Sequence, residues 1–280
     1  LEAGIPAAAT GATPSEYAAV LAPLTAEAFA TGIPSSSAGI GPLAIVELAD
    51  ESVLVSGGPS RSSLYRFTRF GGAAEAPFAE LPYPVYDLAL DADGRLWAAT
   101  GGGPLLWLDA ATGSVVNAYG DGVTQSVEIE PATGRLFVSM ADGIAVFDPE
   151  RATFTMVSGT RVGSLAFSPA GELWAALWPE RGGVVVIGED GSPTLKLEYD
   201  QAIDSLAFGQ PGTDLADLLF VTTNGAGLSG AGGALIVVEL RTLRSVVAAG
   251  GGTRGDIVIV TRDGRVLVSQ SHQVDVLRPL

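Results

Sequence analysis

The feature that most constrains the fold is a repeated block of alternating apolar residues. Each full copy begins with a small or acidic residue, and successive copies start 38 to 51 residues apart. The copies begin at Asp87, Ser126, Ser164, Ser205 and Asp256, with a weaker one at Pro42. Repeats of about forty residues that are rich in strands and poor in helix are typical of β-propeller blades rather than of helical solenoids.

Each repeat also carries a hairpin signal. Pairs such as Asp93-Gly94, Thr133-Gly134 and Asp263-Gly264 separate two apolar runs, and a glycine there supplies the positive φ that a tight hairpin needs. A third strand follows each time, and the fourth strands carry less apolar signal. The sequence therefore predicts an all-β fold, a six-bladed β-propeller of four-stranded antiparallel blades.

The two ends of the chain suggest how the ring closes. The last repeat stops at Leu280 after its third strand, and an N-terminal strand over Thr25–Thr31 would supply the missing fourth. Closure of this kind removes exposed sheet edges. We therefore expect one propeller domain over residues 24–280, preceded by a flexible leader over residues 1–23 in which Ser15–Leu24 could form a short helix.

Charge and composition exclude several classes of partner. The chain has 15 Lys and Arg residues against 31 Asp and Glu residues, a net charge of −16. Such an acidic surface disfavours nucleic acid and anionic membranes, which attract clustered basic residues. No apolar run approaches the ~20 residues that cross a bilayer, and the absence of cysteine excludes disulfides and thiolate metal sites. Because the chain starts at Leu1 without methionine, we expect a mature product or an excised segment. We also expect a bacterial protein that is extracellular or periplasmic, and a monomer.

One repeat resembles a known group of propellers. The unit Asp87-Leu-Ala-Leu-Asp-Ala-Asp-Gly-Arg-Leu-Trp-Ala-Ala-Thr, closed by Trp107-Leu-Asp-Ala-Ala-Thr-Gly, is similar to blades of the NHL, YVTN and gluconolactonase-like propellers. The resemblance covers about residues 40–280. It implies a fold rather than one activity, since these families include lactonases, lyases, quinoprotein dehydrogenases and binding modules.

The residues that carry catalysis in those families are not matched here. The resemblance to gluconolactonase-like enzymes implies a metal held by one Glu, two Asn and one Asp, yet the position of the Glu is Ile40. Neither Asn117 nor Asn224 precedes a first strand. Lyases of the virginiamycin type use a pair of histidines, whereas His272 is the only histidine of this chain. These departures favour a protein without catalytic activity or cofactor.

In a propeller, the loops that lead into the first strands share one face with the loops between second and third strands. The second–third loops would bring Arg61 and Asn224 to that face, and Trp178, beside Pro179 in such a loop, is the aromatic residue that we most expect to be exposed. The predicted ligand-binding residues are Tyr83, Gln125, Arg161, Trp178, Arg181, Arg254 and His272. We expect a non-catalytic extracellular binding module for a protein, peptide or carbohydrate, either alone or as part of a larger surface protein.

An enzyme is the alternative hypothesis. Asp200, Asp204 and Asp256 flank the starts of first strands, and carboxylate oxygens at the tunnel mouth would suit calcium or a similar hard cation. This hypothesis predicts a metal-dependent hydrolase or lyase that acts at the mouth of the central tunnel.

Overall fold

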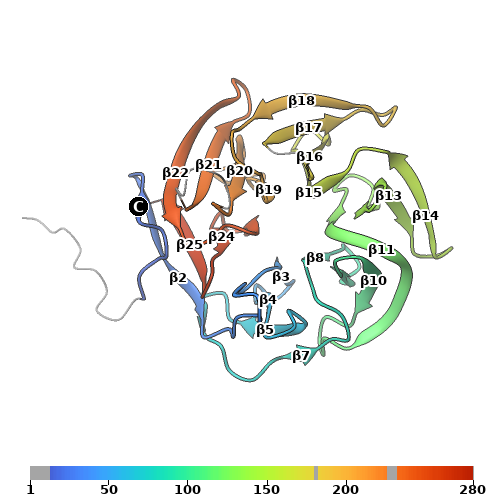
Figure 1. Ribbon diagram of the computed structural model, residues 1–280, viewed down its shortest axis with the longest axis horizontal. Coiled ribbons are helices and arrows are strands. Elements are labelled where there is room, and N and C mark those ends of the chain that lie inside the picture. Colours follow the sequence, from blue (N-terminus) through green and yellow to red (C-terminus); the bar gives the residue numbers. More distant parts are fainter. Residues whose placement is uncertain (1–12, 180–181, 226–231, 280) are drawn as a thin grey trace, which may run out of the picture.

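The fold is a ring of β-strands around a central axis (Figure 1). The computed structural model describes residues 13–179, 182–225 and 232–279. All regular secondary structure in these ranges is β-strand. Accordingly, they contain no helix with the length and hydropathy needed to cross a membrane.

The strands of the described ranges form five hydrogen-bonded sheets. One sheet contains β3 (Ile45–Glu47), β4 (Val53–Gly57), β5 (Ser63–Phe67) and β7 (Ala79–Glu80). The next has seven strands, β8 (Asp87–Leu90), β9 (Leu96–Ala99), β10 (Gly103–Leu108), β11 (Val115–Ile129), β12 (Leu136–Met140), β13 (Gly143–Asp148) and β14 (Thr153–Ser158). A four-stranded sheet follows, with β15 (Val162–Phe167), β16 (Leu173–Leu177), β17 (Gly183–Ile187) and β18 (Pro193–Glu198).

The last two sheets have five strands each. The first contains β19 (Ser205–Phe208), β20 (Leu218–Thr223), β21 (Gly233–Glu239), β22 (Arg244–Gly252) and β1 (Ala19–Val20). The second contains β23 (Val258–Val260), β24 (Val266–Ser269), β25 (Val274–Pro279), β2 (Leu24–Thr31) and β6 (Gly72–Ala73).

The prediction of six separate four-stranded blades is wrong, because the strands form five sheets and only two of these have four strands. The main cause is β11, whose first part pairs with β10 and whose last part pairs with β12. Gly120 and Gly122 have φ values of +59° and +79°, and the pairing register shifts on both sides of this region. Glycines at such bulges bend a strand without ending it, so two groups of strands stay joined in one sheet.

The predicted closure by Thr25–Thr31 is confirmed, since β2 pairs antiparallel with β25 from Leu24 to Ala30. The stretch Ser15–Leu24 contains the strand β1 and no helix. β1 pairs with β22, and Tyr17 is buried among residues of the last two sheets. Ser15 Oγ donates a hydrogen bond of 2.7 Å to Asp275, so this segment packs on the ring.

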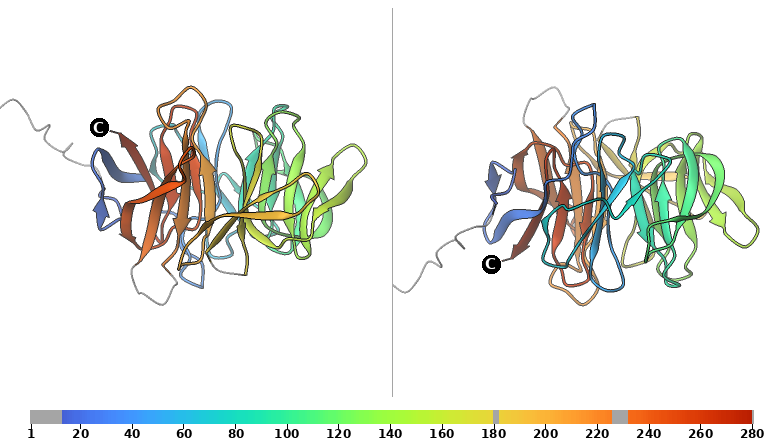
Figure 2. Two further views of the ribbon diagram at one scale, coloured as in Figure 1. Left: turned by 90° about the horizontal axis from the view of Figure 1, so that it is seen from above. Right: turned by 90° about the horizontal axis from the view of Figure 1, so that it is seen from below.

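The innermost strands form the wall of the central tunnel. In order around the ring they are β3, β8, β11, β15, β19 and β23, each in contact with the next, and β23 contacts β3. They start at one face of the ring, which we call the mouth face, and end at the other, the turn face, where hairpin turns lead to the second strands. Figure 2 shows both faces from the side.

The repeated small residue connects neighbouring inner strands. In four cases its side-chain oxygen accepts a hydrogen bond from a backbone N–H of the next inner strand. These bonds are Val127 N to Asp87 (3.1 Å), Leu165 N to Ser126 (3.1 Å), Leu206 N to Ser164 (3.1 Å) and Val258 N to Ser205 (3.2 Å). The repeat in the sequence is therefore a structural device, since each bond satisfies a buried donor and fixes the spacing of two strands.

Apolar side chains fill the spaces between neighbouring groups of strands. Trp97 is 1% exposed and lies with Phe147 and Val138 in one such cluster. Asp91, in the preceding turn, accepts a 3.0 Å hydrogen bond from the Trp97 indole and a 2.7 Å bond from Arg95 Nε. Packing of this kind excludes water from the spaces between neighbouring groups of strands.

Candidate ligand site at the tunnel mouth

A polar cavity of about 190 Å³ opens at the mouth face. Much of its wall comes from the residues that directly precede the repeated residue on five of the six inner strands, Tyr86, Gln125, Gly163, Asp204 and Asp256. Asp256 belongs to this group because Ile257, and not Asp256, holds the position on β23 that Ser205 holds on β19. The residue directly after the repeated position donates its N–H to the preceding inner strand, and on β23 that donor is Val258, which bonds to Ser205. The repeat thus brings side chains that are far apart in sequence to one ring of positions.

Two carboxylates line the cavity, and each has different partners. Arg254 holds Asp256 through two bonds, from Nε (2.5 Å) and from a terminal nitrogen (2.8 Å). Asp204 instead accepts bonds from the backbone N–H (2.7 Å) and the side-chain amide (2.9 Å) of Asn224. Burial, and then the nearby charge of Asp256, raise the pKa of Asp204 to about 7. Asp204 can therefore exchange a proton near neutral pH.

Arginines and aromatic rings share the same face. The Arg61 guanidinium lies 4.9 Å from the centre of the Tyr86 ring, and both residues line the cavity. Arg161 lies 5.2 Å from the ring centre of Trp178, which is 38% exposed. Such cation–π pairs hold a guanidinium in place while leaving its N–H groups available to a ligand.

Some of the predicted ligand-binding residues come together and others do not. Gln125 and Arg254 line the cavity. Arg161 and Trp178 lie beside it, because a Cβ on Gly163 would come within 3.3 Å of Trp178 Cβ and 2.9 Å of the Gln125 side-chain oxygen.

Tyr83 is 40% exposed and lies near Gly103, outside the cavity lining. His272 is exposed and pairs with Glu16, its Nδ1 lying 2.8 Å from a carboxylate oxygen. Arg181 lies outside the described residues.

The predicted metal ligands do not form a metal site. Asp204 and Asp256 line the cavity together, but Asp200 is exposed and is not part of its wall. Arg254 already neutralises Asp256. In the ranges that the structure describes, no three His, Cys, Asp or Glu residues are grouped so that they could hold a metal ion. Calcium takes six to eight oxygen ligands, and these residues do not fit it.

Tyr86 was not identified from the sequence as a site residue. Its signal was its position directly before the repeated residue Asp87, which is the position that Gln125 and Asp204 occupy in their own repeats. Once the ring register is known, the position directly before the repeated residue identifies five of the residues that line the cavity.

The comparisons with known proteins agree with the geometry of the ring. The family "Two component regulator propeller" matches residues 80–102. No curated protein matches the chain. By fold, the chain is a β-propeller.

Three solved structures illustrate the range of proteins with this fold. The pyrroloquinoline quinone (PQQ) domain of a pyranose dehydrogenase from Coprinopsis cinerea aligns with a TM-score of 0.71 at 12% identity, covering 96% of this chain and 98% of its own. A protein described as a gluconolactonase aligns with a TM-score of 0.66 at 13% identity, covering 93% of each chain. The extracellular domain of BT4673 from B. thetaiotaomicron aligns with a TM-score of 0.53 at 15% identity, covering 84% of this chain and 32% of that longer one.

These matches include enzymes and an extracellular domain, and all are below 20% identity. They establish that the chain resembles the gluconolactonase-like and quinoprotein propellers in fold. A shared propeller does not assign an activity, so the function has to be argued from the mouth itself.

Proposed function

We propose that the protein is a non-catalytic binding module that takes a carboxylated carbohydrate at the tunnel mouth. The main support is the arrangement of Arg61 over Tyr86 in the cavity wall. Arg254 is engaged by Asp256, whereas in the described parts of the chain Arg61 has no carboxylate partner. Arg61 is therefore the cation that a carboxylate of the ligand would meet.

The volume and chemistry of the cavity suit one sugar ring. A volume of about 190 Å³ corresponds to about six water molecules at ~30 Å³ each. The Gln125 amide and the Asp204 carboxyl offer donors and acceptors for hydroxyl groups, and the exposed Trp178 beside the cavity offers an apolar ring face. Similarity in fold to an extracellular domain supports our proposal that this binding takes place outside the cytoplasm.

The test is a calorimetric titration with glucuronate and, as the uncharged counterpart, glucose. We expect glucuronate to bind and glucose to bind much more weakly. Arg61→Gln should weaken glucuronate binding about 10- to 100-fold, as loss of a charged hydrogen-bond donor does. Arg161→Gln is the matched control, because Arg161 also lies over an aromatic ring but outside the cavity. Equal binding of the two sugars, or equal effects of the two substitutions, would refute the proposal.

A second candidate function rests on Asp204. A carboxyl with a pKa of about 7 at the wall of a cavity can act as a general acid or base. We propose a hydrolase or lyase acting on uronate oligomers as the alternative. Product release that disappears in Asp204→Asn, with glucuronate binding retained, would favour it, whereas intact oligomers after prolonged incubation would favour the binding module.

A further inference from the structure

The tunnel has a second, larger opening at the turn face. Two adjoining cavities of about 870 and 640 Å³ lie there, and both are bounded by Glu128, Pro131, Ala132, Gln210, Ile259 and Val260. They lie at the ends of the inner strands, whereas the mouth cavity lies at their starts. We propose that this opening binds a small organic ammonium ion, with Glu128 as the counter-ion.

Glu128 interrupts a ring of small and apolar residues. It is the third residue of its repeat, Ser126-Val-Glu-Ile, where three other repeats have Ala89, Ala166 and Ala207. In the register of the ring, Ile259 occupies the same position on β23. Each of these residues lines one or both of the cavities. A single carboxyl therefore lies in a wall that is otherwise hydrocarbon at this level.

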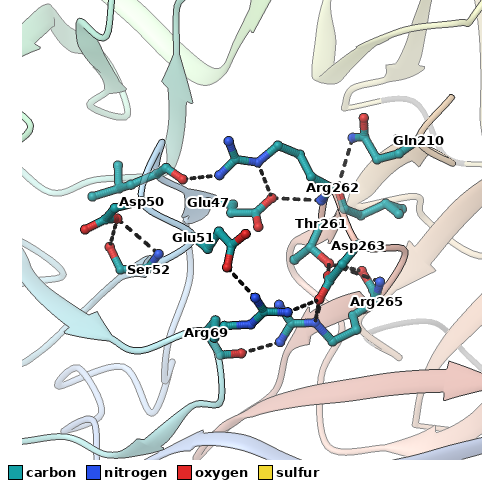
Figure 3. Close-up of polar contacts among 12 residues, drawn as sticks. Glu47, Asp50, Glu51, Ser52, Arg69, Gln210, Thr261, Arg262, Asp263 and Arg265 are labelled. Carbon is teal, nitrogen blue, oxygen red and sulfur yellow. Dashed lines mark hydrogen bonds and ion pairs between the residues drawn. The ribbon is translucent and has the colours of Figure 1, made fainter. Parts of the chain in front are cut away.

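Glu128 also differs from the carboxylates at the rim. Glu47, Asp91 and Glu130 line the same opening. Each is paired with an arginine, at 3.2 Å from Arg262, 2.7 Å from Arg95 and 2.7 Å from Arg135 respectively. Figure 3 shows Glu47 with Arg262, and Gln210 beside them.

Across the described residues, Glu128 has neither a hydrogen-bond donor nor a cationic partner, and the rim arginines are engaged elsewhere. Burial raises the pKa of Glu128 to about 8, and the negative charge of Asp87 on β8 contributes to this rise.

These features select an ammonium with an apolar body. An unpaired carboxyl inside a low-dielectric wall gains most from a cation that also excludes water. Ala89, Ala166, Ala207 and Ile259 would contact hydrocarbon, and burial of that surface adds affinity. The net charge of −16 also attracts cations to the opening. A metal ion is a poor fit, because the grouping of acidic residues that it requires does not occur in the described ranges.

The test uses n-hexylammonium as the probe, titrated calorimetrically at about pH 9. There Glu128 is mostly ionised, and an alkylammonium resembling a lysine side chain, with a pKa of about 10.4, keeps its proton. The controls are 1-hexanol and hexanoate, which share the hydrocarbon. Glu128→Ala is the main variant because it restores the residue of three other repeats, and Glu128→Gln keeps the size of the side chain. Asp93→Asn removes an exposed carboxylate from the same opening and serves as the matched control.

We expect n-hexylammonium to bind the wild-type protein and the Asp93→Asn variant alike. Binding should be at least about 30-fold weaker in both Glu128 variants, as is usual when one partner of a buried charge pair is removed. Absence of binding to the wild type, equal binding of 1-hexanol, or unchanged binding in folded Glu128→Ala would overturn the proposal. Arg61→Gln should leave this binding unchanged, so the result is independent of the function proposed for the mouth.

Discussion

Replacing Glu128 with glutamine should stabilise the protein at neutral and alkaline pH. In the folded protein, burial and the Asp87 charge raise the pKa of Glu128 from 4.5 to about 8. Between these two pH values the unfolded chain releases this proton while the folded protein retains it. The contribution of protonated Glu128 to the free energy of unfolding is therefore fully present below about pH 4.5. It is lost as the pH rises through the folded pKa of about 8.

The size of the effect follows from the two pKa values. At about 1.36 kcal/mol per pH unit, a rise from 4.5 to about 8 corresponds to about 5 kcal/mol. Because the tunnel admits water, the ionised carboxylate keeps part of its hydration, and we expect about half of this value, ~2 to 3 kcal/mol above pH 8. For a chain of this size that equals a difference in melting temperature of roughly 5 °C.

Urea unfolding of the wild type and Glu128→Gln between about pH 4 and pH 9 measures this directly. The two proteins should be equally stable near pH 4 and should diverge as the pH rises, with Glu128→Gln the more stable. Asp93→Asn, at an exposed rim position, should follow the wild-type profile. Parallel profiles for the wild type and Glu128→Gln, or a less stable variant at high pH, would show that Glu128 is not desolvated in the tunnel.

Three further predictions concern the ring and the mouth. Ser164→Ala removes the acceptor of Leu206 N–H and should cost about 1 to 3 kcal/mol in chemical unfolding; a change below ~0.5 kcal/mol would contradict the role of the repeated residue. Asp91 accepts the Trp97 indole and Arg95 Nε bonds at one carboxylate oxygen and the backbone N–H bonds of Asp93 and Arg95 at the other. Asp91→Asn keeps only one acceptor oxygen and must lose one of these two sets, so we expect a loss of about 2 kcal/mol and a red-shifted tryptophan emission. Arg254→Gln removes a positive charge that lowers the pKa of Asp204, so NMR titration should find that pKa above the wild-type value of about 7, and an unchanged or lower value would refute the coupling.

The repeats made the propeller predictable, because their spacing and hairpin signals reflect local backbone chemistry. Ser126, Ser164 and Ser205 recur at one position because their hydroxyl groups accept hydrogen bonds from the next inner strand, and the sequence alone does not reveal these bonds. The alignment of Asp256 with these serines was one residue out. Ile257 corresponds to Ser205 in the ring, so Asp256 corresponds to Asp204, and both aspartates line the mouth cavity.

The division into sheets could not be predicted in the same way. Gly120 and Gly122 suggest a break between two strands, but a bulged strand accommodates the same positive φ values. Glu128 carried a visible signal, a charged residue where other repeats have alanine. Among the described residues Glu128 has no cationic partner, since Arg95, Arg135 and Arg262 pair with other carboxylates. Only the folded ring determines those pairs.

The most direct test of the account is a crystal structure of the protein soaked with glucuronate. We expect one sugar ring in the mouth cavity, with its carboxylate on the Arg61 guanidinium and its hydroxyl groups near Gln125 and Asp204. Glucuronate bound elsewhere, or a mouth free of sugar in crystals that bind it at another face, would contradict the central claim that the mouth of this propeller binds acidic carbohydrate.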